Sequence, residues 1–206
     1  MKTLFVLDTS PRHDALSRKL TQKFVSSWTA ANPDGAVLHH DIGTNPPAHL
    51  DDELIDALRR NPETLNQRQL DALNASDATI EDLARADMIV IGAPMHNFTI
   101  TGSFRAWIDH IARPGKTFGY SSNRPQGLLN DKPVYVLSTR GGQYGDGDPD
   151  NPHPADFQTG FLHHIFRFIG LQTVTIIAAN GMDMGEEARM AGLDKAEKAI
   201  SAVFAN

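Results

Sequence analysis

The sequence predicts an α/β protein built on a doubly wound parallel sheet of five strands. Three observations favour this fold class. Short apolar runs recur along the chain without the polar alternation of half-exposed strands. Longer stretches with apolar residues three or four positions apart separate these runs, which is typical of amphipathic helices. The 206 residues can bury a substantial core, and we expect one domain over residues 1–206.

The apolar runs predict the strands in chain order. They are Thr3–Leu7, Ala36–His40, Met88–Ala93, Val134–Ser138 and Val174–Ala178. The run at Ala36–His40 is the weakest and is expected at the edge of the sheet. Right-handed crossovers between five such strands favour the order 2-1-3-4-5.

The stretches between the strands predict helices. Those with one clear apolar stripe are Ser17 to about Ala31, Thr101 to Ala112, Asp156 to Ile169 and about Gly185 to Phe204. The long segment from Asn45 opens with two prolines, which break regular structure. It is expected to form two helices, around Asp51–Arg60 and Asn66–Ala86, with Pro62 between them. We expect Asn123–Asp131 to be irregular.

Composition excludes several classes of function. There are 19 Lys and Arg against 25 Asp and Glu, and the net charge of −6 opposes binding to nucleic acid or an anionic membrane. The chain has no cysteine, which excludes disulfides, thiolate metal sites and a Cys nucleophile. The nine histidines show no metal-ligand spacing, so we expect no metal. The amino-terminal run is a poor signal peptide, and no run approaches the ~20 apolar residues of a membrane span, so we expect a cytoplasmic protein.

In a doubly wound sheet, ligands bind beyond the carboxyl ends of the strands, near the first and third strands. After the first strand, Ser10, Arg12, Ser17 and Arg18 surround a predicted helix start, which is a suitable site for an anion. Ser17 is open to two compatible interpretations, a helix N-cap or a phosphate ligand. Neither a GxGxxG motif nor a Walker A motif is present.

Two further strand ends carry unusual loops. The loop after the third strand exposes Met95 and Phe98 beside Asn97, and could present amides and apolar contacts to a flat heterocycle. After the fourth strand, Gly141 and Gly142 allow a close approach of the backbone to a ligand.

Four motifs in this order resemble the bacterial FMN-dependent, NADH-using azoreductases, which are also described as quinone reductases. The motifs are SPR-x4-S from Ser10, APMHNF from Ala93, FGY from Phe118 and STRGG from Ser138. The resemblance extends over nearly the whole chain and includes the late helix GFLHHIFRFIGL. It implies a dimeric flavodoxin-like protein that binds FMN and uses NADH to reduce quinones and azo compounds by ping-pong two-electron hydride transfer.

By the same resemblance, site residues can be assigned. The cofactor-binding residues are Ser10, Ala15, Leu16, Ser17, Met95, His96, Asn97, Phe98, Thr139, Arg140, Gly141 and Gly142. A substrate pocket, shared across a dimer, would include Phe118, Tyr120 and Phe161. Backbone donors at 97–98 and 141–142 are expected to face negative charge on the flavin ring. No catalytic side chain is assigned, because the chemistry belongs to the flavin, although His96 could donate a proton.

Three residues depart from the family pattern. Ala15 stands where a serine is common, His96 replaces a tyrosine, and Asn180 replaces a glutamate. The alternative function is a flavodoxin-type FMN electron carrier that docks protein partners, although the apolar loops and mild charge of this chain favour a small-molecule pocket. A non-enzymatic signalling domain is a third interpretation. The physiological acceptor and the choice between NADH and NADPH stay open.

Overall fold

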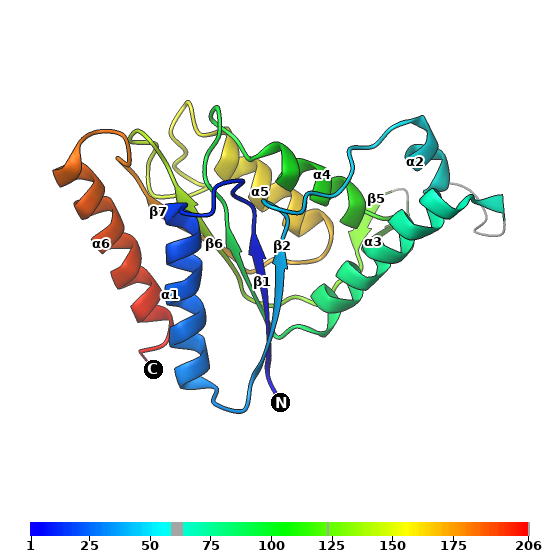
Figure 1. Ribbon diagram of the computed structural model, residues 1–206, viewed down its shortest axis with the longest axis horizontal. Coiled ribbons are helices and arrows are strands. Elements are labelled where there is room, and N and C mark those ends of the chain that lie inside the picture. Colours follow the sequence, from blue (N-terminus) through cyan, green and yellow to red (C-terminus); the bar gives the residue numbers. More distant parts are fainter. Residues whose placement is uncertain (59–63, 123, 206) are drawn as a thin grey trace.

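A five-stranded parallel sheet forms the centre of the molecule (Figure 1). The computed structural model describes residues 1–58, 64–122 and 124–205. The strands are β1 (Thr3–Asp8), β2 (Ala36–Asp41), β3 (Met88–Gly92), β6 (Val134–Thr139) and β7 (Val174–Ala179). Their order is β2-β1-β3-β6-β7. This confirms the predicted order, because β6 and β7 are the fourth and fifth strands of this sheet along the chain.

Helices cover both faces of the sheet, as Figure 1 shows. They are α1 (Leu16–Ala31) and α6 (Glu186–Val203) on one face, and α3 (Gln67–Arg85), α4 (Gly102–Ile111) and α5 (Phe157–Phe168) on the other. Alternate residues of β1 therefore enter two different cores. Leu4 and Val6 pack with the α1 and α6 side, whereas Phe5 and Leu7 pack with the opposite side. Burial on both faces explains why the strand is apolar throughout.

The crossover from β2 to β3 contains α2 (Asp52–Ala57) and α3, which together form an arm at one edge of the molecule (Figure 1). Side chains cap both helices. The carboxylate of Asp51 accepts the amide of Leu54, and Asn66 forms a reciprocal capping box with Gln69. The predicted pair of helices is confirmed, while the positions predicted for Arg60 and Pro62 lie outside the described residues.

An antiparallel hairpin of β4 (Phe118–Ser121) and β5 (Arg124–Gly127) was missed from the sequence. The expectation of irregular structure is therefore wrong for 124–127. The segment RPQG has no β-branched or aromatic residue, so its local preference for a strand is weak. Tertiary contacts hold it instead. A Cβ at Gly127 would lie 2.1 Å from the amide nitrogen of Gly170, which shows how closely the hairpin packs against the end of α5.

His163 on α5 gives a testable pH dependence. Neither ring nitrogen has a hydrogen-bond partner within the described part of the chain. Burial lowers the pKa of His163, and the charge of Arg167 lowers it further. The unfolded chain therefore takes up this proton more readily, so this residue reduces stability as the pH falls below about 6.5.

Replacing His163 with leucine is expected to reduce the loss of unfolding free energy between about pH 8 and about pH 5.5. Urea unfolding at both pH values measures the difference. The exposed neighbour His164, changed to leucine, serves as the control. An equal pH dependence in the His163 variant and the parent protein would contradict the assignment.

Candidate functional site

A cleft of about 430 Å³ lies at the carboxyl ends of the parallel strands. It is formed by the loops after β1, β3, β6 and β7, together with the start of α1. Its lining includes the predicted residues Ser10, Ala15, Leu16, Met95, His96, Thr139, Arg140 and Gly141. The sheet thus brings sequence-distant loops to one site, as expected for a doubly wound fold.

The loop between β1 and α1 is suited to an anion. The side-chain oxygen of Ser10 accepts the amide of Arg12 at 3.3 Å, so the loop folds back on itself beside the cleft. Ala15 is the N-cap of α1 and supplies no side-chain cap. The amides in the first turn therefore lack the side-chain oxygen that usually satisfies them, and the helix dipole favours negative charge there.

Ser17 lies inside the first turn of α1, so its interpretation as an N-cap is wrong. Its hydroxyl is buried and has no hydrogen-bond partner among the residues that the structure describes. An unpaired buried hydroxyl costs free energy, which an acceptor such as a phosphate oxygen would recover. This orphaned group fits the phosphate role predicted for Ser17, although Ser17 does not itself line the cleft.

The loop after β3 is a tight left-handed turn. His96 and Thr99 exchange two backbone hydrogen bonds of 3.0 Å, and the two residues between them have φ values of 46° at Asn97 and 71° at Phe98. Positive φ at both central positions is the type I′ pattern, which normally favours glycine or asparagine. Phe98 adopts this conformation, and the residue is 48% exposed. Strain of this kind is characteristic of functional loops.

The glycine loop after β6 is held by its carbonyl groups. Those of Gly141 and Gly142 accept the amides of Asp183 and Gly181 at 3.0 and 2.9 Å. Their own amides donate to no group in the described ranges, and Gly141 lines the cleft whereas Gly142 does not. The side chain of Arg140 turns inward and is completely buried. It contacts Asp156 at 2.9 Å. The backbone N–H of Arg140 donates to the carbonyl of Ala179 at 2.8 Å, and its carbonyl accepts the amide of Met182 at 3.0 Å, so its backbone N–H is not free for a ligand either.

Asn180 stabilises the far end of the same loop. Its side-chain oxygen accepts the amide of Tyr144 at 3.2 Å, and its nitrogen donates to the carbonyl of Gly145 at 2.7 Å. A glutamate carboxylate could not make the second bond, because it has no N–H. The asparagine at this position therefore suits this loop, because its amide links the backbone of Tyr144 to that of Gly145. The sequence did not reveal these two hydrogen bonds.

The three residues predicted for the substrate pocket do not line the cleft of their own chain. Phe118 is buried against Phe168, with ring centroids 4.5 Å apart, and Tyr120 is 73% exposed. The ring of Phe161 lies under the guanidinium of Arg105 at 5.6 Å. Their predicted role involves a second subunit and stays a prediction.

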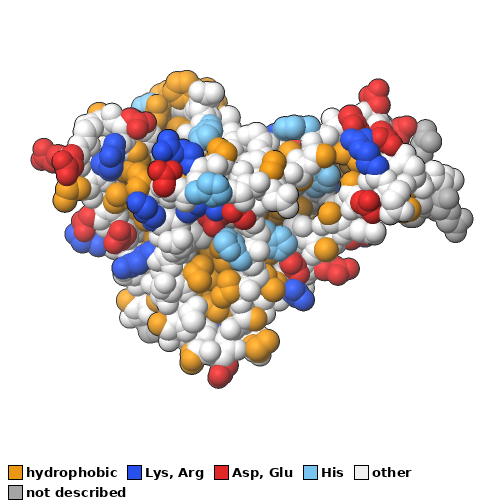
Figure 2. Space-filling model, in the orientation of Figure 1, with side chains coloured by type: hydrophobic (Ala, Val, Ile, Leu, Met, Phe, Trp, Pro, Cys, Tyr) orange, Lys and Arg blue, Asp and Glu red, His pale blue; other side chains and the backbone are white. Residues whose placement is uncertain are grey.

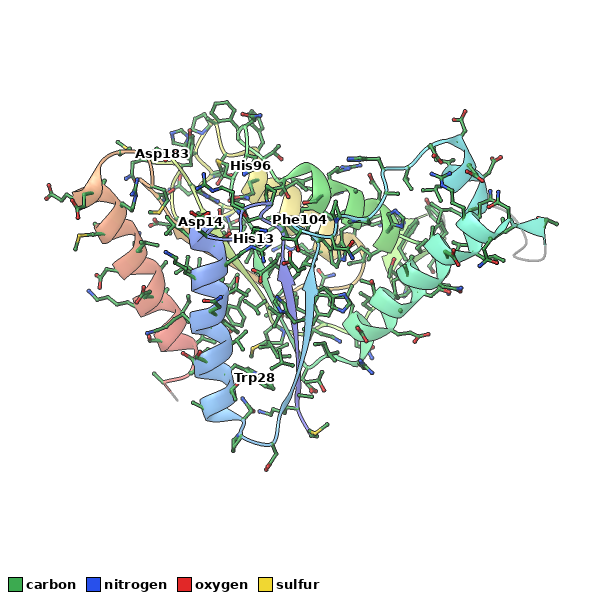
Figure 3. All side chains as sticks on the ribbon, viewed as in Figure 1. His13, Asp14, Trp28, His96, Phe104 and Asp183 are labelled. Atoms are coloured by element: carbon green, nitrogen blue, oxygen red, sulfur yellow. The ribbon has the colours of Figure 1, made fainter. Side chains whose placement is uncertain are left out.

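Several cleft residues were not predicted. Asp14, Lys19, Pro94, Met182, Asp183 and Arg189 also line it, together with Arg12, which was considered only for its charge. Figure 3 shows His13, Asp14, His96 and Asp183 at the same end of the sheet, whereas Trp28 lies at the opposite end of α1. Met182 and Asp183 could have been predicted from their position just after β7, because the carboxyl ends of all the parallel strands lie at this edge of the sheet.

A second cavity, of about 460 Å³, lies beside β2, α3 and α4. It is lined in part by His40, Trp107 and His110, and histidines gather over the middle of this face in Figure 2. None of the residues predicted to bind the cofactor lines it. The cleft is therefore the stronger candidate, because it brings together the start of α1, where an anion site is predicted, and the loops after β3 and β6.

The described residues hold neither a metal cluster nor a membrane span. Within residues 1–58, 64–122 and 124–205, no group of three or more His, Asp or Glu side chains is placed to hold a metal ion. No helix in these ranges has the length and apolar character needed to cross a membrane.

Comparison with known proteins gives consistent matches. A profile of the flavodoxin-like fold matches residues 1–204. The FMN-dependent NADH:quinone oxidoreductase 2 of Pseudomonas fluorescens (strain Pf0-1) is 39% identical over 98% of this chain and 100% of its own length. The FMN-dependent NADH:quinone oxidoreductase of Azospirillum brasilense is 41% identical over 96% and 95% of the two chains.

Solved structures show the same fold. An azoreductase from Bacillus anthracis aligns with a TM-score of 0.83 at 25% identity, covering 98% of this chain and 100% of that one. An FMN-dependent NADH-azoreductase from the same species, solved in complex with FMN, aligns with a TM-score of 0.84 at 20% identity and covers 98% and 99%. The second likeness supports the fold alone.

Proposed function

This chain belongs to the flavodoxin-like family of FMN-dependent NADH:quinone oxidoreductases, and from that membership we propose that it binds FMN in the cleft and reduces quinones and azo compounds. NADH is the donor, and donor and acceptor use the site in turn, in a ping-pong order. One observation carries the proposal. Within the described part of the chain, the cleft joins the uncapped start of α1, beside the buried unpaired hydroxyl of Ser17, to the loop after β3 with Met95 and to the loop after β6 with the unbonded amide of Gly141.

Different residues in and beside the cleft would hold the phosphate and the ring of FMN. Ser10, Ser17 and the first-turn amides of α1 would bind the phosphate. The loop from Met95 to Phe98 would contact the edge of the ring, while the free amides of Gly141 and Gly142 would stabilise negative charge there. Bound FMN supplies the two-electron redox chemistry. The protein would orient the bound group, and His96, which lines the cleft and is exposed, could donate a proton to the acceptor.

We further propose a homodimer in which Phe118, Tyr120 and Phe161 of one subunit complete the substrate pocket of the other. The exposed ring of Tyr120 supports this, since an aromatic side chain with so little contact in its own chain is typical of interfaces. The cytoplasmic location expected from the sequence stays a prediction.

Purified protein tests the proposal directly. We expect a yellow protein with flavin absorbance that oxidises NADH in the presence of menadione or benzoquinone. An azo dye should also be reduced. Double-reciprocal plots at several acceptor concentrations should give parallel lines, as a ping-pong order requires.

Each other outcome has a defined meaning. A colourless protein that FMN cannot reconstitute would contradict flavin binding. A flavin-containing protein without NADH turnover would favour the electron carrier. Intersecting double-reciprocal lines would contradict the ping-pong order while leaving the reaction itself intact.

A further inference from the structure

Arg18 is a nearly buried cation directly behind the loop that joins β1 to α1. Its side chain is on the first turn of α1, and the residue is 8% exposed. It does not line the cleft, so it is not placed as a direct ligand for an anion. Instead its guanidinium donates to the carbonyl of Ser10 at 2.6 Å and to the carbonyl of Arg12 at 2.9 Å.

These two bonds fix the conformation of the loop. In a trans peptide the C=O and the N–H point in opposite directions. When Arg18 holds the carbonyl of Arg12, the amide N–H of His13 must point away from the guanidinium. The bond to Ser10 fixes a residue that lines the cleft. Arg18 therefore determines which polar groups the loop can present to a ligand.

Asp41, at the end of β2, holds the guanidinium from the other side. Its two carboxylate oxygens accept from Arg18 at 2.7 and 2.8 Å in a bidentate pair. The carboxylate also accepts the amides of Gly43 and Thr44, both at 3.1 Å. This partly buried ion pair is a weak source of net stability, whereas its fixed fork geometry orients the groups around it.

The packing is tight where the loop after β2 meets Arg18. A Cβ at Gly43 would lie 1.9 Å from the carbonyl oxygen of Ser10 and 2.9 Å from a guanidinium nitrogen of Arg18. The loop after β2 and the side chain of Arg18 thus enclose the same carbonyl. The carboxylate of Asp8 lies 3.7 Å from the guanidinium and adds a second negative charge.

We propose that Arg18, clamped by Asp41, is a positioning residue that holds the 9–15 loop in its phosphate-binding conformation. By this role it makes the cleft select FMN, which carries a phosphate, over riboflavin, which does not. The inference rests on the proposed binding of FMN. It predicts that a change at Arg18 affects the phosphate end of the site and leaves the ring end unchanged.

Flavin titration of the full-length chain, freed of bound flavin, tests this prediction. Arg18→Met is expected to weaken FMN binding by about tenfold or more, since two charge-assisted hydrogen bonds that order the loop are lost. Riboflavin affinity should change by less than about twofold. Arg18→Lys keeps the charge but not the fork, and should give an intermediate loss of FMN affinity. Fluorescence quenching of each flavin gives both dissociation constants.

Two further variants keep the test decisive. Asp41→Asn preserves the shape of the side chain and weakens its hold on Arg18, so it should lower the ratio of FMN affinity to riboflavin affinity. This variant keeps the test valid if Arg18→Met folds poorly. Arg85→Met removes an exposed arginine that pairs with Asp82, and this control should leave the ratio of FMN affinity to riboflavin affinity unchanged. Equal losses for FMN and riboflavin, or an unchanged ratio in the Arg18 and Asp41 variants, would overturn the inference alone. Failure of the parent protein to bind FMN would overturn the proposed function as well.

Discussion

Replacing Arg140 with methionine is expected to lower the free energy of unfolding by about 3–5 kcal/mol, the usual cost of leaving a buried charge without its partner. The guanidinium contacts the carboxylate of Asp156 at 2.9 Å and donates to Thr159 at 3.0 Å and Ser138 at 3.0 Å. Arg140 and Asp156 are both buried, so water cannot replace the lost contacts. Urea unfolding measures the change.

A double variant separates the charge effect from lost packing. An asparagine at position 156 would retain the oxygen that caps α5, so Asp156→Asn combined with Arg140→Met removes both charges while keeping the cap. We expect the loss of unfolding free energy in the double variant to be smaller than the sum of the losses in the two single variants, by about 1 kcal/mol or more. Lys198→Met, at an ion pair with Asp194 in which both side chains are exposed, should cost less than about 1 kcal/mol. Strict additivity of the two buried changes would contradict a direct interaction.

Gly141→Val is expected to weaken FMN binding by about a hundredfold, or roughly 3 kcal/mol, because a branched side chain would occupy the space through which the ring reaches the backbone. The fold should survive. The nearest atom to a Cβ at this position is Oδ2 of Asp183, at 2.5 Å, and that carboxylate can rotate away. Flavin titration and thermal unfolding of the same sample measure the two effects separately.

The control for this change is Gly160→Ala on α5, where an added Cβ meets nothing within 4 Å. Its FMN affinity should equal that of the parent protein. The FMN affinity of Gly141→Ala should lie between those of the control and of Gly141→Val, because alanine adds only one carbon. Unchanged affinity in the valine variant would mean that the loop after β6 does not contact the cofactor.

The position of the candidate cleft could be predicted because the carboxyl ends of parallel strands lie at one edge of the sheet. Once the apolar runs defined five strands, their carboxyl ends had to meet at one edge. Ser10, Met95 and Gly141 each follow such a run and now line one cleft. The clearest failures were the hairpin of β4 and β5, whose second strand has little strand preference, and Ser17, which lies within α1 and does not cap it.

By itself the sequence determined the fold class, the strand order, the family and the approximate position of the candidate flavin site. These properties depend on local apolar periodicity and on motifs that stand next to predicted strand ends. Only the tertiary structure decided what the polar side chains do there. Arg140 turns inward to Asp156, and Arg18 meets Asp41 across 23 positions of sequence. Such pairings arise from how β2, α1 and α5 pack, and side-chain burial of this kind has no signature in local spacing.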